Sequence, residues 1–214
     1  KFNYDRGRKF VVDAMDDEET AGIAFGKLSS EFIRTKVVPE MDAFRFATYA
    51  SLDGIGKATG TLADGAAVIT ALRVAANKMD EDEVPAEQRV LFITPTLRGM
   101  IDGLDILKSK EVLAKFSSVV EVPQSRFNTK IKLLDGTTGG EEVGGFEATG
   151  SDINFMVVHT PAILQYPKHT VNKIITPEAN QDSDGWMFFY RAYGLADAYE
   201  NKTAGIYVHT KAGA

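Results

Sequence analysis

The chain of 214 residues contains no cysteine, which excludes disulfide bonds, thiolate metal sites and cysteine nucleophiles. It also lacks an excess of basic residues, because 24 Lys and Arg stand against 30 Asp and Glu, a formal net charge of -6. A chain with this balance has no general attraction for nucleic acid, since neutralising phosphates requires clustered Lys and Arg. If it encloses DNA, we expect it to do so as a wall and not as a specific binder.

Long apolar runs are absent as well. No stretch approaches the roughly 20 apolar residues of a membrane-spanning helix, and the charged opening KFNYDRGRKF lacks the apolar stretch of a signal peptide. We therefore predict no membrane partner. The sequence does not begin with Met, so we expect further residues upstream.

Residues that could bind a metal are scarce. The three histidines, His159, His169 and His209, have spacings that fit no metal motif, and we predict that they lie at the surface or at strand ends. Residues 180–185 (NQDSDG) begin like a calcium-binding EF-hand loop, but Arg191 stands where the twelfth position requires Glu. A turn is the prediction for this segment, and a weak cation site is the alternative.

Motifs for phosphate binding or nucleophilic catalysis are also missing. The glycines at 139, 140, 144 and 145 match neither G-x-G-x-x-G nor a P-loop, and the neighbouring glutamates would repel phosphate. No serine stands in a nucleophile elbow. We therefore predict no catalytic residue, no metal site and no cofactor.

The first quarter of the sequence predicts a strand and then a long helix. Apolar and polar residues alternate over residues 8–15, which is typical of a strand. Four consecutive carboxylates follow: Asp16, Asp17, Glu18 and Glu19. They suit the positive end of a helix dipole. Apolar residues then recur three and four positions apart over residues 18–49, which predicts a helix that Pro39 bends or divides.

The middle of the chain predicts helices around one strand. Residues 51–64 are rich in Gly, Ala and Thr and are predicted to form a flexible join. Asp64 can cap a helix, whose predicted apolar stripe is Val68, Ile69, Leu72, Ala75, Ala76 and Met79. Residues 89–94 (RVLFIT) predict a buried strand, and Thr94-Pro95 begins another helix.

The remainder of the chain is predicted to be mainly β. Seven strands are expected, at residues 118–122, 130–134, 153–159, 162–166, 171–176, 186–197 and 204–209. Residues 137–150 are rich in Gly, and we predict a mobile loop that moves or contacts a neighbour. Taken alone, these patterns indicate a soluble protein of mixed helices and strands.

Four segments add a resemblance: RGRKFVVDAMDDEETAGIAFGKLSSEFIRTKVVPEMDAFRFA, VLFITPTLRGMI, VVEVPQSRF and the stretch from PAILQYPKH to TAGIYVH. In this order they resemble the major capsid proteins of tailed bacteriophages, which have the Hong Kong 97 phage capsid fold. The first resembles the end of the extended loop and the spine helix. The next two resemble parts of the axial domain, and the last resembles the closing strands of the peripheral domain.

The resemblance implies an α+β fold with three stretches. Residues 1–49 would form the end of the extended loop and the spine helix of the peripheral domain. Residues 50–156 would form the axial domain, and residues 157–214 would form peripheral-domain strands that return to the axial domain.

The resemblance also implies a structural function rather than an enzymatic one. Copies of the chain would self-assemble as pentamers and hexamers into an icosahedral shell that encloses DNA without sequence-specific binding. The virion would be assembled in the cytoplasm of a bacterial host, with scaffold and portal proteins as further partners.

Charged residues are the predicted intersubunit contacts of such a shell. The first set comprises Arg6, Arg8 and Lys9. The complementary sets are Asp16, Asp17, Glu18 and Glu19, together with Arg34 and Lys36. Salt bridges within one chain are the alternative for these residues.

Two other functions remain open. One is an encapsulin-type nanocompartment shell, which has the same subunit shape and a protein cargo. The other is a small α/β ligand-binding or enzymatic domain, which would need a polar pocket with convergent side chains.

Overall fold

The computed structural model describes residues 1–15, 23–104 and 106–213. Their contacts divide the chain into two compact units. Unit 1 comprises Lys1–Met41 and Gln165–Ala196, and unit 2 comprises Asp42–Leu164 and Asp197–Ala214. Each unit therefore contains segments that lie far apart in the sequence.

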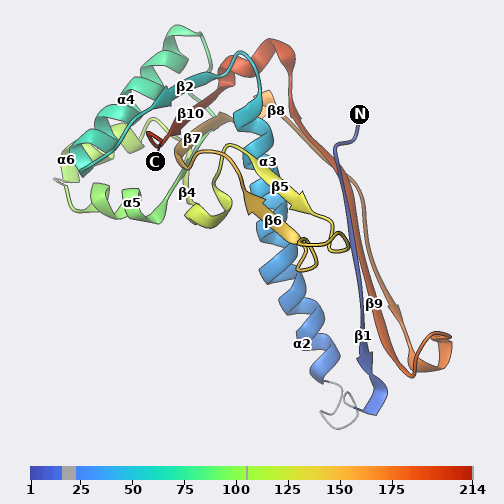
Figure 1. Ribbon diagram of the computed structural model, residues 1–214. Helices are drawn as coiled ribbons and strands as arrows, with labels where there is room; N and C mark the ends of the chain where they lie inside the picture. The colour runs from blue at the N-terminus through green and yellow to red at the C-terminus, as the bar shows by residue number, and fades with distance from the viewer. Residues whose placement is uncertain (16–22, 105, 214) are drawn as a thin grey trace. The chain divides into compact units, whose positions relative to one another are not determined.

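Unit 1 is built on a three-stranded sheet in the order β1-β9-β8 (Figure 1). The strands are β1 (Tyr4–Asp13), β8 (Ile163–Ile175) and β9 (Gly185–Ala198). β1 runs antiparallel to β9, from the pair Tyr4–Gly194 to the pair Asp13–Gly185. The strand predicted over residues 8–15 is therefore present, but its pairing with β9 extends it to Tyr4 and ends it at Asp13.

The predicted long helix is divided in the structure. It consists of α2 (Ile23–Phe32), a π-helical turn (Ile33–Val37) and α3 (Val38–Ser51). Pro39 has no N–H to donate to the carbonyl four residues earlier, so the α-helical ladder cannot be regular here. The N–H of Val38 instead reaches the carbonyl of Ile33. The predicted interruption is confirmed, although the irregular turn precedes the proline. Residues 18–22 lie outside the described residues.

One face of the three-stranded sheet is packed by aromatic rings. Phe32 of α2 lies edge-on to Phe10 of β1 at 5.6 Å and to Tyr190 of β9 at 6.2 Å between ring centroids. Phe10 also packs on Phe188 at 4.9 Å. Alternation along β1 and β9 places these rings on one side of the sheet, and the helix of unit 1 covers that side.

Unit 2 contains a five-stranded sheet in the order β2-β10-β7-β3-β4. Its strands are β2 (Gly56–Thr59), β3 (Arg89–Ile93), β4 (Ser118–Glu121), β7 (Ile153–His159) and β10 (Ile206–Thr210). β7 is antiparallel to both β3 and β10, and all seven of its residues are buried. β2 and β4 run parallel to their neighbours at the two edges.

Three helices cover one face of this sheet (Figure 1): α4 (Gly65–Glu81), α5 (Pro95–Asp102) and α6 (Ile106–Leu113). Asp64 caps α4 as predicted, since its Oδ1 accepts a hydrogen bond from the N–H of Ala67 at 2.8 Å. The predicted apolar stripe of α4 is fully buried. It joins Leu91, Ile93, Phe155 and Val157 of the sheet in one hydrophobic core.

A separate hairpin completes unit 2. It is formed by β5 (Ile131–Leu134) and β6 (Gly145–Ala148) in antiparallel register. Short 3₁₀ helices lie in the connections of unit 2 at Gln124–Arg126, Thr160–Ala162 and Glu200–Gly205, and unit 1 has one at Pro177–Ala179.

Three local predictions are wrong. Residues 51–64 are not wholly a join, since they contain β2, which pairs with β10 across some 150 residues. Residues 137–150 are not wholly a loop, since they contain β6. The strands predicted at 162–166 and 171–176 are one strand, β8, which tolerates Pro167 because it lies at the edge of its sheet.

The compact units have other bounds than the predicted domains. The predicted boundary at residue 156 falls inside β7, which the five-stranded sheet contains whole. The contact boundary falls inside α3, between Met41 and Asp42. The assignment of residues 50–156 to an axial domain stays a prediction.

Candidate interaction surfaces

Within the described ranges, no group of three or more His, Asp or Glu could hold a metal ion. His159 and His209 lie near strand ends, as predicted, but both are buried in unit 2. The side chain of His169 is not among those that the structure describes. None of the helices described here is long and apolar enough to cross a membrane.

The His209 imidazole is part of a buried hydrogen-bond chain. The amide nitrogen of Asn154 lies 3.0 Å from its Nδ1 and also donates to the carbonyl of Gly60 at 3.2 Å. The ring stacks on Phe155, with 5.0 Å between centroids. Burial lowers the pKa of His209, and burial, Arg89 and Lys202 lower that of His159. Both rings are therefore neutral at pH 7 and are parts of the core.

The EF-hand-like segment is a bend closed by its own side chains. The side-chain Oδ1 of Asn180 accepts a hydrogen bond from the N–H of Asp182 at 3.1 Å. Its amide donates to Ser183 Oγ and to the carbonyl of Gly185, both at 2.9 Å. The first candidate cation ligand is thus used to hold the connection into β9.

A hollow of about 490 Å³ lies in unit 2, lined by Thr129, Lys130, Thr149, Gly150, Ser151, Asp152, Lys211, Ala212 and Gly213. Its Lys211 and Asp152 approach each other at 3.9 Å. The ion pair partly neutralises the two charges, and the remaining lining consists of small residues and Lys130. This is a weak basis for a ligand-binding or catalytic pocket.

Glu40 at the start of α3 holds β1 within unit 1. Arg6 donates two hydrogen bonds to its carboxylate, from Nε to Oε1 at 2.7 Å and from Nη2 to Oε2 at 3.2 Å. The Tyr4 hydroxyl donates to Oε1 at 3.2 Å, and burial together with the carboxylate raises the pKa of Tyr4. Bidentate pairing of this kind is strong and directional. Arg6 therefore has an intramolecular partner, whether or not it also meets another subunit.

The other predicted contact residues have different surroundings. Lys9 reaches Asp182 at 3.3 Å, and Arg34 pairs with Glu31 at 2.7 Å, as its helical spacing suggests. Arg8 and Lys36 are exposed and take part in no salt bridge within the described part of the chain. Asp16, Asp17, Glu18 and Glu19 lie outside the described residues.

The second face of the three-stranded sheet carries aromatic rings beside cations. Lys168 lies 4.8 Å from the ring centroid of Phe2 and 5.6 Å from that of Tyr193. Lys9 lies 5.6 Å from the ring of Phe189. Such cation–π contacts at exposed sites each contribute about 0.5–1 kcal/mol. Among the residues that the structure describes, no ring contact joins the helix of unit 1 to this face, whereas Phe32 covers the other face.

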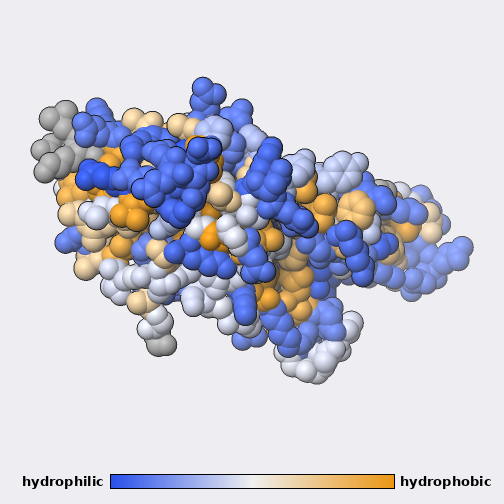
Figure 2. Space-filling view, turned by 90° about the horizontal axis from the view of Figure 1, so that it is seen from above, coloured by the Kyte–Doolittle hydropathy of each residue, from blue (hydrophilic) through white to orange (hydrophobic). Residues whose placement is uncertain are grey.

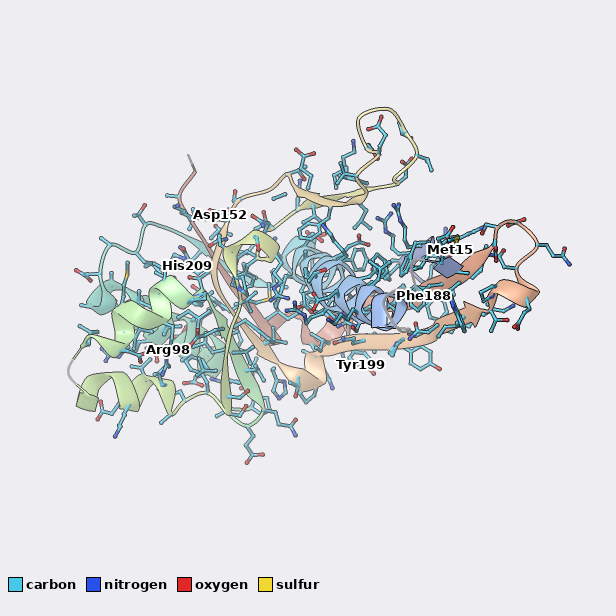
Figure 3. The ribbon with its side chains drawn as sticks, turned by 90° about the horizontal axis from the view of Figure 1, so that it is seen from below. Met15, Arg98, Asp152, Phe188, Tyr199 and His209 are labelled. Atoms are coloured by element: carbon cyan, nitrogen blue, oxygen red, sulfur yellow. The ribbon has the colours of Figure 1, made fainter. Side chains whose placement is uncertain are left out.

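Exposed apolar side chains are dispersed over the surface. On the face shown in Figure 2, hydrophobic residues are scattered among hydrophilic ones. Val143 is the most exposed of the large hydrophobic residues described, at 88%. It lies in the loop between β5 and β6, which extends away from the five-stranded sheet of its unit (Figure 3).

Sequence reasoning missed Glu40, Lys168 and Val143. Glu40 follows Pro39 in a helix rich in charges, and nothing in its spacing marks it as a partner of Tyr4 and Arg6. Lys168 and Phe2 are 166 residues apart, so their contact depends on strand order. The Gly-rich loop did carry a signal, because a valine among glycines and glutamates is an unusual apolar residue in a polar turn.

Comparison of the sequence with protein-family models and with curated proteins finds no match. Solved structures do match. A chain of Mycobacterium phage Che8 has a TM-score of 0.67 at 13% identity, covering 97% of this chain and 70% of that one. A virus-like particle from Pyrococcus furiosus gives 0.64 at 10% identity, covering 96% and 76%.

The capsid of the Cyanophage P-SCSP1u has a TM-score of 0.60 at 12% identity, covering 100% of this chain and 73% of that one. These identities are too low to carry function, but the matches extend over both units of the chain. They confirm the fold class predicted from the sequence: the chain has the α+β Hong Kong 97 fold of phage major capsid proteins.

Proposed function

We propose that this chain is the major capsid protein of a tailed phage or prophage, a shell subunit with no catalytic role. The observation that carries the proposal is the match of nearly the whole chain to phage capsid subunits, at TM-scores of 0.60 and 0.67. A match confined to one unit would have supported only a domain in common with capsid proteins. A match over both units supports the same subunit fold throughout the chain.

The chemistry of the chain supports the same function. Two of the polar groups that sequence analysis weighed, His209 and Asn180, are hydrogen-bonded within the fold. A net charge of -6 suits a wall around DNA better than a surface that binds DNA tightly.

Shell assembly needs many contacts rather than one strong contact. Copies that meet through heterologous surfaces close into rings and then into a cage when the rotation between them closes. Because each copy meets several neighbours at once, individually weak contacts suffice. Self-assembly into pentamers and hexamers, with scaffold and portal partners, belongs to this proposal, as does a virion assembled in the host cytoplasm.

The structure changes the order in which we rank the predicted charged residues as intersubunit contacts. Arg8 and Lys36 are exposed, and Arg34 is held only by an exposed neighbour on its own helix, so all three can reach a second subunit. Arg6 is committed to Glu40. We therefore place Arg8, Arg34 and Lys36 ahead of Arg6 as intersubunit contacts.

Electron microscopy of the full-length gene product that carries this sequence tests the function. We expect shells, rings or flat sheets, and nucleic acid inside particles taken from the native source. A protein that stays monomeric at every concentration and salt condition, and in the native source, would contradict the proposal. Particles filled with a protein cargo instead of DNA would favour the nanocompartment. The resemblance to the Pyrococcus furiosus particle is compatible with both functions, so this experiment distinguishes them.

A further inference from the structure

The turn between β5 and β6 is held by a dense set of hydrogen bonds. We call residues 135–144 the hairpin tip. The Asp135 carboxylate accepts from the N–H groups of Thr137 and Thr138, at 2.7 and 2.8 Å, and from the Thr138 hydroxyl at 2.5 Å. Glu141 accepts from the N–H of Asp135 at 3.1 Å and pairs with Lys132 at 2.5 Å. The tip therefore has a defined conformation and loses little entropy on binding.

This ordered tip presents an apolar side chain and negative charge. Val143 is 88% exposed, although a polar residue at this position would suit a turn that contacts only water. Asp135, Glu141 and Glu142 supply three carboxylates and the tip has no basic residue. Hydrogen bonds lower the pKa of all three, so they are ionised at neutral pH.

A surface of opposite character lies on the helix of unit 1. We call Lys27, Leu28, Arg34, Thr35 and Val38 the helix strip. All five residues are exposed, whereas Val37 and Glu40 of the same helical segment are buried. Leu28 is 45% exposed and Val38 is 43% exposed. With Glu31 and the flanking Lys36, residues 27–38 carry three positive charges and one negative.

We propose that the hairpin tip of one copy docks on the helix strip of a second copy, with Val143 against Leu28 or Val38 and the tip carboxylates near Lys27 and Arg34. The two surfaces complement each other in charge, and each carries exposed apolar groups flanked by that charge. The proposal rests on the proposed shell function, because it identifies one of the contacts that build the shell.

Cysteine pairing tests the contact directly, because the chain has no cysteine of its own. Two single variants, Val143→Cys and Thr35→Cys, are purified separately with tags of different size, mixed and oxidised. Linkage between the two tags can form only between copies. The matched control replaces Val143→Cys by Val74→Cys, since Val74 is also an exposed valine of unit 2, at 53%. We expect at least roughly tenfold more linked product from the tip than from the control.

Charge reversal provides the second test. Glu142→Lys and Arg34→Glu should each lower the yield of assemblies, and the double variant should recover it, because the reversed charges attract again. Val143→Asp should weaken self-association at least roughly tenfold, as loss of an apolar anchor does. Val74→Asp should leave it unchanged.

The outcomes separate the two proposals. Shells of the wild-type protein without preferential linkage of Val143→Cys to Thr35→Cys would overturn the docking and leave the shell function standing. Preferential linkage without shells, rings or flat sheets under any condition would uphold the docking and overturn the function. A Val143→Asp protein that assembles like the wild type would also overturn the docking.

Discussion

The two units bury their sheets in different ways. In unit 2, helices α4, α5 and α6 cover one face of the five-stranded sheet, and Phe46 of α3 packs against Phe92 at 5.2 Å on the other face. In unit 1, Phe32 of the described helix covers one face of the three-stranded sheet, and the second face carries Lys168 beside Tyr193 as well as the buried Met187. Unit 2 therefore has a conventional core, whereas unit 1 depends more on specific polar and aromatic contacts.

This difference suggests that the two units contribute differently to stability and to binding. A sheet buried on both faces is stabilised by apolar area, at roughly 25 cal/mol per Å². A sheet with a helix on only one face has less such area and leaves more of its side chains available to other molecules. We infer that unit 2 determines most of the stability of the chain and that unit 1 would offer much of the surface for neighbours in the proposed shell.

The largest expected effect is in the core of unit 2. Leu72→Ala removes a fully buried side chain from α4, and we expect a loss of about 3 kcal/mol in the free energy of unfolding. Chemical denaturation measures the loss, and hydrogen exchange should show it in β3 and β7 first. If exchange in β1 and β9 increases as much as in β7, the two units unfold together and the contrast between them is wrong.

The next effect is in unit 1. Glu40→Gln removes the charge that Arg6 and Tyr4 bind and leaves the Arg6 guanidinium facing an amide. A hydrogen-bonded charge in a largely buried site contributes about 2 kcal/mol, and we expect that loss in denaturation experiments. Hydrogen exchange of β1 should rise while that of β7 stays constant. A variant as stable as the wild type would mean that Glu40 does not hold β1.

A smaller effect should follow pH. Burial lowers the pKa of His209 and of His159 in the folded state, so the unfolded chain binds more protons below the ordinary histidine pKa of about 6.5. Stability should therefore be full above that pH and fall as the pH drops through it toward the lower folded pKa. His209→Gln should flatten the dependence of the melting temperature on pH between neutral and mildly acidic buffers. An unchanged slope in both this variant and His159→Gln would contradict the assignment.

The smallest effect is expected at an exposed pair of unit 1. Arg191 grips Asp5 at 2.7 and 2.9 Å across β9 and β1, which resembles the Arg6–Glu40 geometry but is open to solvent. Because water screens such a pair, Asp5→Asn should leave the melting temperature unchanged within error. This variant is the matched control for Glu40→Gln. A comparable loss in both would show that burial does not distinguish the two pairs.

Local patterns predicted the elements that have their own sequence signals. The α4 helix followed from its Asp64 cap and its apolar stripe, and the strand predicted at residues 153–159 has the bounds of β7, in which five of the seven residues are apolar. The interruption near Pro39 followed from the missing N–H. β2 was missed because its four small or polar residues form a strand by pairing with the distant β10. β6 was missed because its glycine and glutamate gave it the composition of the Gly-rich turn before it.

The sequence by itself determined the absence of cysteine, an acidic balance, a long interrupted helix, and an order of segments that resembles phage capsid proteins. Only the tertiary structure decided which residues act together, such as Tyr4 and Arg6 on Glu40, or Lys168 beside Phe2. It also decided which side chains remain open, such as Val143. Periodicity is local and is written along the chain, whereas a contact between residues 34 or 166 positions apart depends on strand order and helix packing.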